Sequence, residues 1–213
     1  MNKYIKITII LITLAILGFI SYNMLSPNIE KMSYEIITDK AEISKIITDS
    51  FLDILIETKN YNSKEINYED MLETTMRISR ELDLFKEMST DTNFYEYVPE
   101  NTIHSMITEL TGKSVDSPIK VEDFYYLYNE EGKYYYVVPV GTDWIHIEEI
   151  KEIRKIKNGD YYTITCSTSF SEDGLTSYDS GNVKVTLKHC PDNKYIRYQL
   201  VSMEHTKGTL EEI

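Results

Sequence analysis

The sequence predicts an α+β fold in which about three helices pack on a bent antiparallel sheet of about six strands, behind an N-terminal transmembrane helix. Three observations lead to this prediction. An uncharged apolar run opens the chain, apolar residues then recur at helical spacing up to residue 112, and alternating patterns dominate from residue 124 onwards. Because a period of 3.6 indicates helices and a period of 2 indicates strands, the helices should precede the strands.

The apolar run covers Ile7–Leu25, nineteen residues without a charge. As a helix it would be roughly 28 Å long, close to the thickness of a bilayer's hydrocarbon core. Lys3 and Lys6 precede it, which favours a cytoplasmic N-terminus and an exported C-terminal portion. The alternatives are a cleaved signal peptide and a buried core helix, but the end of the run lacks small residues at the spacing that signal peptidase needs.

We therefore expect a single-pass protein of the cell membrane. Residues 1–25 would form a cytoplasmic tip and signal-anchor, residues 26–38 a tether, and residues 39–213 one α+β domain outside the cytoplasm. Beyond residue 25 the chain carries 35 acidic and 20 basic residues, a formal charge of −15. Such a surface repels phosphate backbones, so nucleic acid is excluded as a partner and a cationic protein or cell-wall partner is favoured.

Capping residues and apolar stripes mark the helices. Each predicted helix follows a residue suited to a helix start, and apolar side chains recur three and four positions apart within it. The predicted helices cover residues 40–58 after Asp39, residues 68–88 after Asn67, and the segment from Pro99 to Gly112, where glycine ends the helix in the left-handed conformation.

Alternation and turn residues mark the strands. A hairpin is expected to pair residues 124–128 with residues 133–140, and a second hairpin turns at Asn158-Gly159. Further strands are expected over residues 182–190 and after Pro191-Asp192-Asn193. The segment Ile147–Ile156 is ambiguous, since its isoleucines every three residues also fit a short helix. Alternation places Cys166 and Cys190 on opposite strand faces, so no disulfide is expected.

The order of these elements over residues 40–206 resembles the nuclear transport factor 2-like family, whose fold is a cone of N-terminal helices and a strongly bent antiparallel sheet. A helix at Ile147–Ile156 would break this match. The resemblance implies a cone-fold domain, here exported by a Gram-positive-type bacterium. Similar-looking membrane-tethered domains occur in conjugation and secretion machinery, where they act as scaffold subunits.

Motifs for catalysis, phosphate binding and metal binding are missing from the sequence, so neither a cofactor nor a metal is expected. The oxygen-rich stretch from Ser171 to Gly181 fails the spacing of a calcium loop. His146 is the best single catalytic candidate, because strand alternation would place Trp144, His146 and Glu148 on one face. An imidazole in that setting can act as a general base, although a structural histidine is the more common case.

Tyrosines form the other candidate site. With a turn at residues 129–132, Tyr126 and Tyr135 share one face of the first hairpin, while Leu127, Tyr134 and Tyr136 share the other. A sheet that is aromatic on both faces needs a cover on both faces, by helices on one and by a partner on the other. Tyr126, Tyr135, Trp144 and His146 are therefore the predicted binding residues.

The expected function is a non-enzymatic binding or scaffold domain that acts on a protein or cell-envelope partner. It would serve either as a scaffold of the secretion or conjugation type or as a regulator of cell-wall hydrolases. The alternative is a small pocket enzyme or ligand carrier of the cone fold that uses His146 and Glu148.

Overall fold

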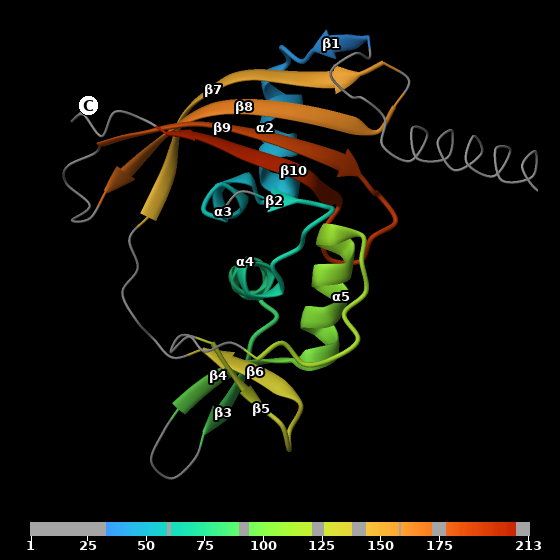
Figure 1. Ribbon diagram of the computed structural model, residues 1–213, viewed down its shortest axis with the longest axis vertical. Helices are drawn as coiled ribbons and strands as arrows, with labels where there is room; N and C mark the ends of the chain where they lie inside the picture. Colours follow the sequence, from blue (N-terminus) through green and yellow to red (C-terminus); the bar gives the residue numbers. More distant parts are fainter. Residues whose placement is uncertain are drawn as a thin grey trace, which may run out of the picture. The chain divides into compact units, whose positions relative to one another are not determined.

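A computed structural model describes residues 33–58, 61–89, 94–120, 126–137, 144–157, 159–171 and 178–207. This part of the chain contains four helices and two antiparallel sheets, which confirms the predicted α+β class (Figure 1). The predicted transmembrane run Ile7–Leu25 lies outside the described residues. Within them, no helix is both long and apolar enough to cross a membrane.

The first predicted helix is divided into two. Helix α2 (Lys40–Ser50) begins as expected, with the Asp39 carboxylate accepting a hydrogen bond from the Glu42 backbone N–H at 2.8 Å. It ends at Phe51, which has a left-handed backbone (φ 53°), and α3 (Leu52–Leu55) follows. In one continuous helix the side chains of Leu52 and Ile46 would point about 120° apart around the axis. The break allows Ile46, Leu52 and Leu55 all to be buried.

The second predicted helix is too long at its C-terminal end. Helix α4 (Tyr68–Glu81) begins after Asn67, whose side chain accepts from the Glu69 N–H at 3.0 Å. It stops because Asp83 adopts a left-handed conformation (φ 54°) that turns the chain away from the helix axis. The residues predicted to continue the helix instead include strand β3 (Lys86–Ser89).

The third predicted helix is confirmed at both ends. Helix α5 (Glu100–Thr111) follows Pro99 and ends at Gly112, whose φ is 72°. A Cβ at Gly112 would also lie 2.3 Å from Nε2 of Gln199, so a side chain there would strain the backbone and displace the end of the Gln199 side chain. The strand that leads into α5, β4 (Phe94–Pro99), was not predicted.

The smaller sheet has the order β3-β4-β6-β5. Its hairpin joins β5 (Tyr126–Asn129) to β6 (Tyr134–Val137), with Asn129 paired to Tyr134, so the predicted hairpin is confirmed. Strands β3 and β4 add to this hairpin through β6. The chain therefore has a second sheet where the sequence predicted a single one.

The larger sheet has the order β1-β7-β8-β9-β10-β2. Its strands are β1 (Tyr34–Ile36), β7 (Trp144–Ile156), β8 (Tyr161–Ser171), β9 (Tyr178–His189), β10 (Tyr198–Lys207) and β2 (Tyr61–Asn62). Consecutive long strands pair antiparallel from β7 to β10, as expected for hairpins. Strand β1 falls within the segment that the sequence assigns to a tether.

Strand β7 resolves the ambiguity of the isoleucine repeat. Its register against β8 shifts twice, between Ile147 and Glu149 and again between Ile150 and Glu152. Each shift is a bulge that inserts one extra residue. Ile147, Ile150 and Ile153 therefore oppose residues 168, 166 and 164 and lie on one face, although they are three positions apart. The short-helix alternative for this segment is wrong.

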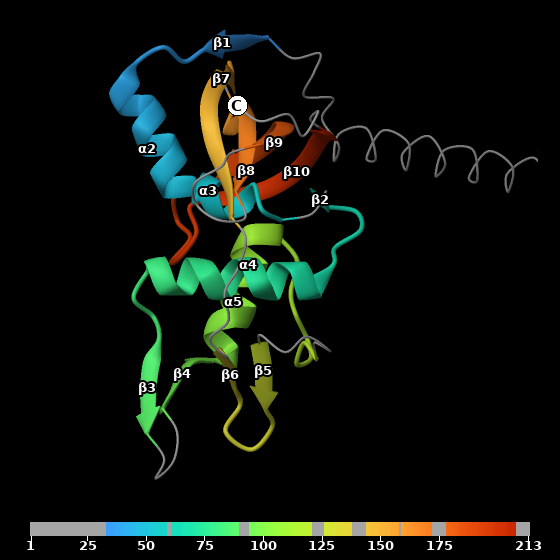
Figure 2. The same cartoon turned by 90° about the vertical axis from the view of Figure 1, so that its left-hand side faces the viewer.

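One core joins both sheets. It includes Val98 and Tyr135 from the smaller sheet and Ile164 and Val185 from the larger one, with apolar residues of all four helices among them. Helices α4 and α5 lie between the two sheets in both views (Figures 1 and 2). Cys166 is buried on this inner face and Cys190 is half-buried after β9, both as free thiols.

Candidate functional site

The predicted row of Trp144, His146 and Glu148 is interrupted by the first bulge of β7. His146 is exposed and lies opposite Ser169, while Glu148 falls at the bulge and accepts a hydrogen bond from the Ser169 hydroxyl. In this part of the structure neither a hydrogen bond nor an ion pair joins His146 to Glu148. The backbone of Trp144 pairs with Ser171, and its side chain lies outside the described atoms.

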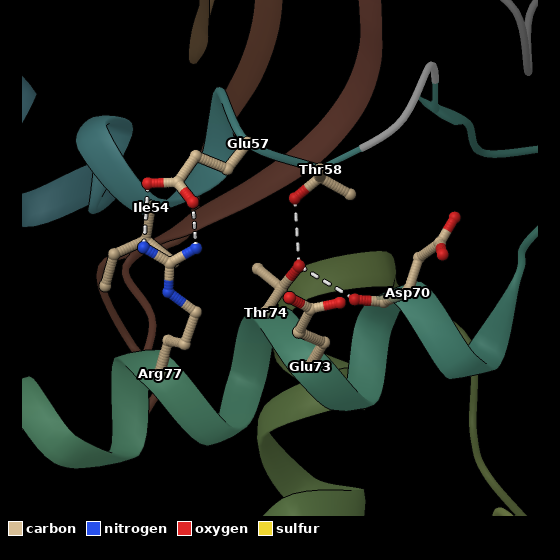
Figure 3. Close-up of a pocket in the computed structure, with 7 residues that line it drawn as sticks. All are labelled: Ile54, Glu57, Thr58, Asp70, Glu73, Thr74 and Arg77. Atoms are coloured by element: carbon tan, nitrogen blue, oxygen red, sulfur yellow. Dashed lines mark hydrogen bonds and ion pairs between the residues drawn. The ribbon is translucent and has the colours of Figure 1, made fainter. Parts of the chain in front are cut away.

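A small pocket lies between α3 and α4 (Figure 3). Arg77 binds the Glu57 carboxylate with both terminal nitrogens, the second contact at 2.7 Å. The hydroxyls of Thr58 and Thr74 are 2.9 Å apart, and Thr74 donates to the Asp70 carbonyl at 2.8 Å. The cavity volume is about 40 Å³, enough for one water molecule and far below that of an organic ligand site.

Metal binding finds no support among the described side chains, where no three His, Cys, Asp or Glu residues converge as ligands. The pocket between α3 and α4 is also remote in sequence from His146, which lies on β7 and lines no part of it.

The smaller sheet separates its tyrosines as the alternation predicted. The register pairs Leu127 with Tyr136 and Tyr128 with Tyr135, so the two sets face opposite sides. The inner side carries Tyr135 and Val98, both 0% exposed. Tyr135 is therefore a core residue and is unavailable to a partner at the surface. The Tyr126 backbone belongs to the same inner side, and its side chain is not described.

The outer side of this sheet carries a second set of aromatic residues, here called the tyrosine face: Tyr97, Tyr134 and Tyr136, with Leu127 beside them. The rings of Tyr97 and Tyr134 are 4.8 Å apart between centroids, and those of Tyr134 and Tyr136 are 6.2 Å apart. All four side chains are half-buried. Helices α4 and α5 contact the opposite, inner side of the sheet, where Arg80 pairs with Glu96 and His104 lies beside Tyr135.

A polar cluster lies beneath the inner side, formed by Glu100 and His104 of α5 with Tyr128 and Tyr135 of the hairpin. We call it the His104 cluster. His104 Nε2 is 3.3 Å from the Tyr135 hydroxyl and 3.8 Å from Glu100 Oε1. The Ile119 N–H donates to the same hydroxyl at 2.8 Å. The Tyr128 ring lies 5.0 Å from that of Tyr135.

Burial dominates the electrostatics of this cluster. It lowers the pKa of His104 below its ordinary value, an effect that the negative charge of Glu100 partly offsets. It also raises the pKa of Tyr135 to about 12, although the hydrogen bond from Ile119 acts in the opposite direction. The imidazole is therefore neutral and the phenol protonated at pH 7.

The His104 cluster was not predicted. The sequence offers no histidine, cysteine or carboxylate at metal-ligand spacing from His104, apart from Glu100 one helical turn earlier. Its other partner, Tyr135, comes 31 residues later on a different element. A glutamate and a histidine at positions i and i+4 were the available signal, but that spacing is common on ordinary helix surfaces.

Comparison with known proteins identifies no relative: the chain matches no family model, no curated protein and no solved structure.

Proposed function

We propose that this protein is a membrane-anchored, extracytoplasmic binding domain that docks a basic protein partner on the tyrosine face. The observation that carries the proposal is the side-by-side placement of Tyr97, Tyr134 and Tyr136 on the side of the smaller sheet opposite its contacts with α4 and α5. Such a set of half-buried aromatic residues provides apolar area that a partner can bury.

The chemistry of tyrosine suits this role. Its side chain offers a large contact area with only two rotatable bonds, so little conformational entropy is lost on binding, and its hydroxyl can still form a hydrogen bond. Tyrosine is accordingly enriched at the centres of protein interfaces. The formal charge of −15 beyond residue 25 attracts basic partners at long range, and tyrosine rings can bind lysine and arginine through cation–π contacts.

The location is part of the proposal. The uncharged run Ile7–Leu25 behind two lysines supports a signal-anchor with the domain outside the cytoplasm. In that setting a scaffold of the secretion or conjugation type and a regulator of cell-wall hydrolases both fit an aromatic docking surface on a domain of negative net charge. We also propose that the larger sheet with its preceding helices is a divergent cone of the nuclear transport factor 2 type. This rests on the order of helices before long strands.

The alternative function is a small pocket enzyme or ligand carrier that uses His146 and Glu148. It has less support, because Glu148 is engaged by Ser169 and His146 is exposed. The pocket between α3 and α4 has polar groups that are already paired with one another.

Site-specific crosslinking in intact cells tests the docking surface. A photoreactive residue replaces Tyr136 in the full chain, and the control replaces Tyr161, another half-buried tyrosine on a strand of the larger sheet. We expect a crosslinked protein from position 136 only. The same membranes should retain the uncleaved chain after alkaline extraction, with an intact mass that includes residues 1–25.

Once the crosslinked partner is purified, binding can be measured directly. Truncating a central aromatic anchor costs about 2 kcal/mol, so Tyr136→Ala should weaken the affinity roughly thirtyfold, and added salt should weaken it further. Tyr161→Ala and His146→Ala should bind as wild type. A crosslink from position 161 but not 136, or an adduct that carries wall glycan instead of protein, would contradict this proposal.

A further inference from the structure

The His104 cluster holds a surface segment through one chain of hydrogen bonds. The Tyr135 hydroxyl accepts the N–H of Ile119, so its own proton is free to be donated elsewhere. The acceptor within reach is His104 Nε2, 3.3 Å away. This arrangement requires a neutral imidazole with its proton on Nδ1. The segment over residues 113–120 follows α5. Its contact with Tyr135 depends on these two linked hydrogen bonds.

Protonation of His104 reverses the hydrogen bond between Tyr135 and His104. Nε2 becomes a donor, and the buried Tyr135 hydroxyl loses the acceptor for its proton. A hydroxyl left without an acceptor in a buried setting pays its full desolvation cost. Tyr135 is 0% exposed, so water cannot easily take the place of the imidazole.

The charged groups around His104 do not cancel this effect. Glu100 on the same helix is the nearest, but 3.8 Å is longer than a normal hydrogen bond. The Glu100 carboxylate also takes a hydrogen bond from Tyr128 of β5. Glu130, in the turn of the same hairpin, is paired with Lys120 at 2.6 Å. Tyr135 of β6 faces the imidazole directly, with 3.3 Å between its hydroxyl and His104 Nε2.

We propose that the His104 cluster is a proton-sensitive latch, in which protonation of His104 releases the segment over residues 113–120 from Tyr135. The sign follows from linkage. A released histidine takes up its proton near pH 6.5, whereas burial lowers the pKa of the latched one, so acid favours the released form. The latch is complete above pH 6.5 and weakens as the pH falls toward the lowered pKa.

Hydrogen exchange followed by mass spectrometry tests the latch on the full chain in lipid nanodiscs. After correction for the intrinsic exchange rate, peptides that contain Ile119 should exchange several-fold faster at pH 5.5 than at pH 7.5, since each pKa unit between the two forms changes the latch equilibrium tenfold. His104→Gln keeps an amide oxygen that can accept from Tyr135 but cannot titrate, so this response should disappear. The exposed His146→Gln is the matched control and should keep it.

The proposal fails if wild type shows equal protection at both pH values, or if His104→Gln responds to pH as wild type does. The second result would assign the response to a carboxylate. Should His104→Gln not fold, the imidazole signals of the wild-type chain provide an independent measurement by NMR. His104 must then titrate below pH 6.5, and titration at or above that value overturns the latch.

Discussion

Tyr61 and Tyr135 are both buried, but among the described residues only the Tyr135 hydroxyl has a hydrogen-bond partner. Tyr61 is 4% exposed, and in the described part of the structure its hydroxyl forms no hydrogen bond. Tyr135 is buried to a similar degree, but its hydroxyl accepts the Ile119 N–H at 2.8 Å. Because an unpaired buried hydroxyl costs free energy and a paired one contributes it, the two residues should respond differently to loss of that atom.

We predict that Tyr61→Phe leaves the free energy of unfolding unchanged or raises it by about 1 kcal/mol, whereas Tyr135→Phe lowers it by about 1–2 kcal/mol. Urea denaturation of both variants against wild type measures the difference at constant side-chain volume. A loss of stability in Tyr61→Phe equal to that in Tyr135→Phe would mean that the Tyr61 hydroxyl has a partner outside the described residues.

Single residues that act on their own neighbours in sequence were predictable. Asp39 and Asn67 cap helices and Gly112 ends one, because a cap depends on the two or three residues beside it. The roles of His104 and Tyr135 were not predictable, since each is set by an element that lies elsewhere in the chain. Alternation assigned Tyr135 to the correct set but could not say which side of the sheet faces the core.

At the scale of the element, β7 shows where a sequence period is ambiguous. Isoleucines three residues apart fit a helix, and they fit a strand only if bulges are inserted between them. The bulges are visible only once β8 is in place as the reference for the register. Helix α4 was extended too far for a similar reason, because Leu82 and Phe85 continue its stripe while Asp83 turns the chain.

The bulged register of β7 can be tested with neighbouring residues. Ile150 faces the core in this register, whereas a strand without the first bulge would turn Glu149 inward instead. We predict that Ile150→Ala lowers the free energy of unfolding by about 1–3 kcal/mol and that Glu149→Ala changes it by less than about 0.5 kcal/mol. The reverse order of the two effects in chemical denaturation would contradict the bulge.

Contacts between distant elements fix the arrangement around α5. The Glu109 carboxylate accepts three backbone N–H groups of the turn before β10, from Lys194 at 3.0 Å and from Tyr195 and Ile196 at 2.8 Å. A carboxylate bound by several N–H groups forms strong hydrogen bonds, so this contact ties α5 to the larger sheet. At its other end α5 meets β4, and through His104 and Tyr135 it meets β6 of the smaller sheet. No local pattern in the sequence indicates either contact.

On the scale of the whole molecule, the sequence predicted the class of fold but a single sheet. The second sheet escaped prediction because its central pair, β4 with β6, joins segments on either side of α5. Strands β4 and β6 are short. In the sequence, β3 was predicted as the end of a helix and β4 as a loop. Long-range pairing of short strands depends on what the helices leave uncovered, which a one-dimensional pattern does not contain.

The shared core determines how the domain should unfold. Val98 and Tyr135 of one sheet belong to the same apolar cluster as Ile164 and Val185 of the other, through α4 and α5. A domain with one contiguous core unfolds in a single transition. Both cysteines are free thiols, and burial raises the pKa of Cys166 to about 11, which keeps it unreactive at neutral pH.

We therefore predict one cooperative transition that is insensitive to reductant. The curve from the fluorescence of Trp144, the single tryptophan of the chain, should coincide with the curve from far-UV circular dichroism, which averages over both sheets and all helices. Val98→Ala, in the smaller sheet, should move both curves together and lower the free energy of unfolding from each by about 1–3 kcal/mol. If only the dichroism curve moves, the two sheets unfold separately and the core is not shared. A lower midpoint with reductant would instead reveal a disulfide.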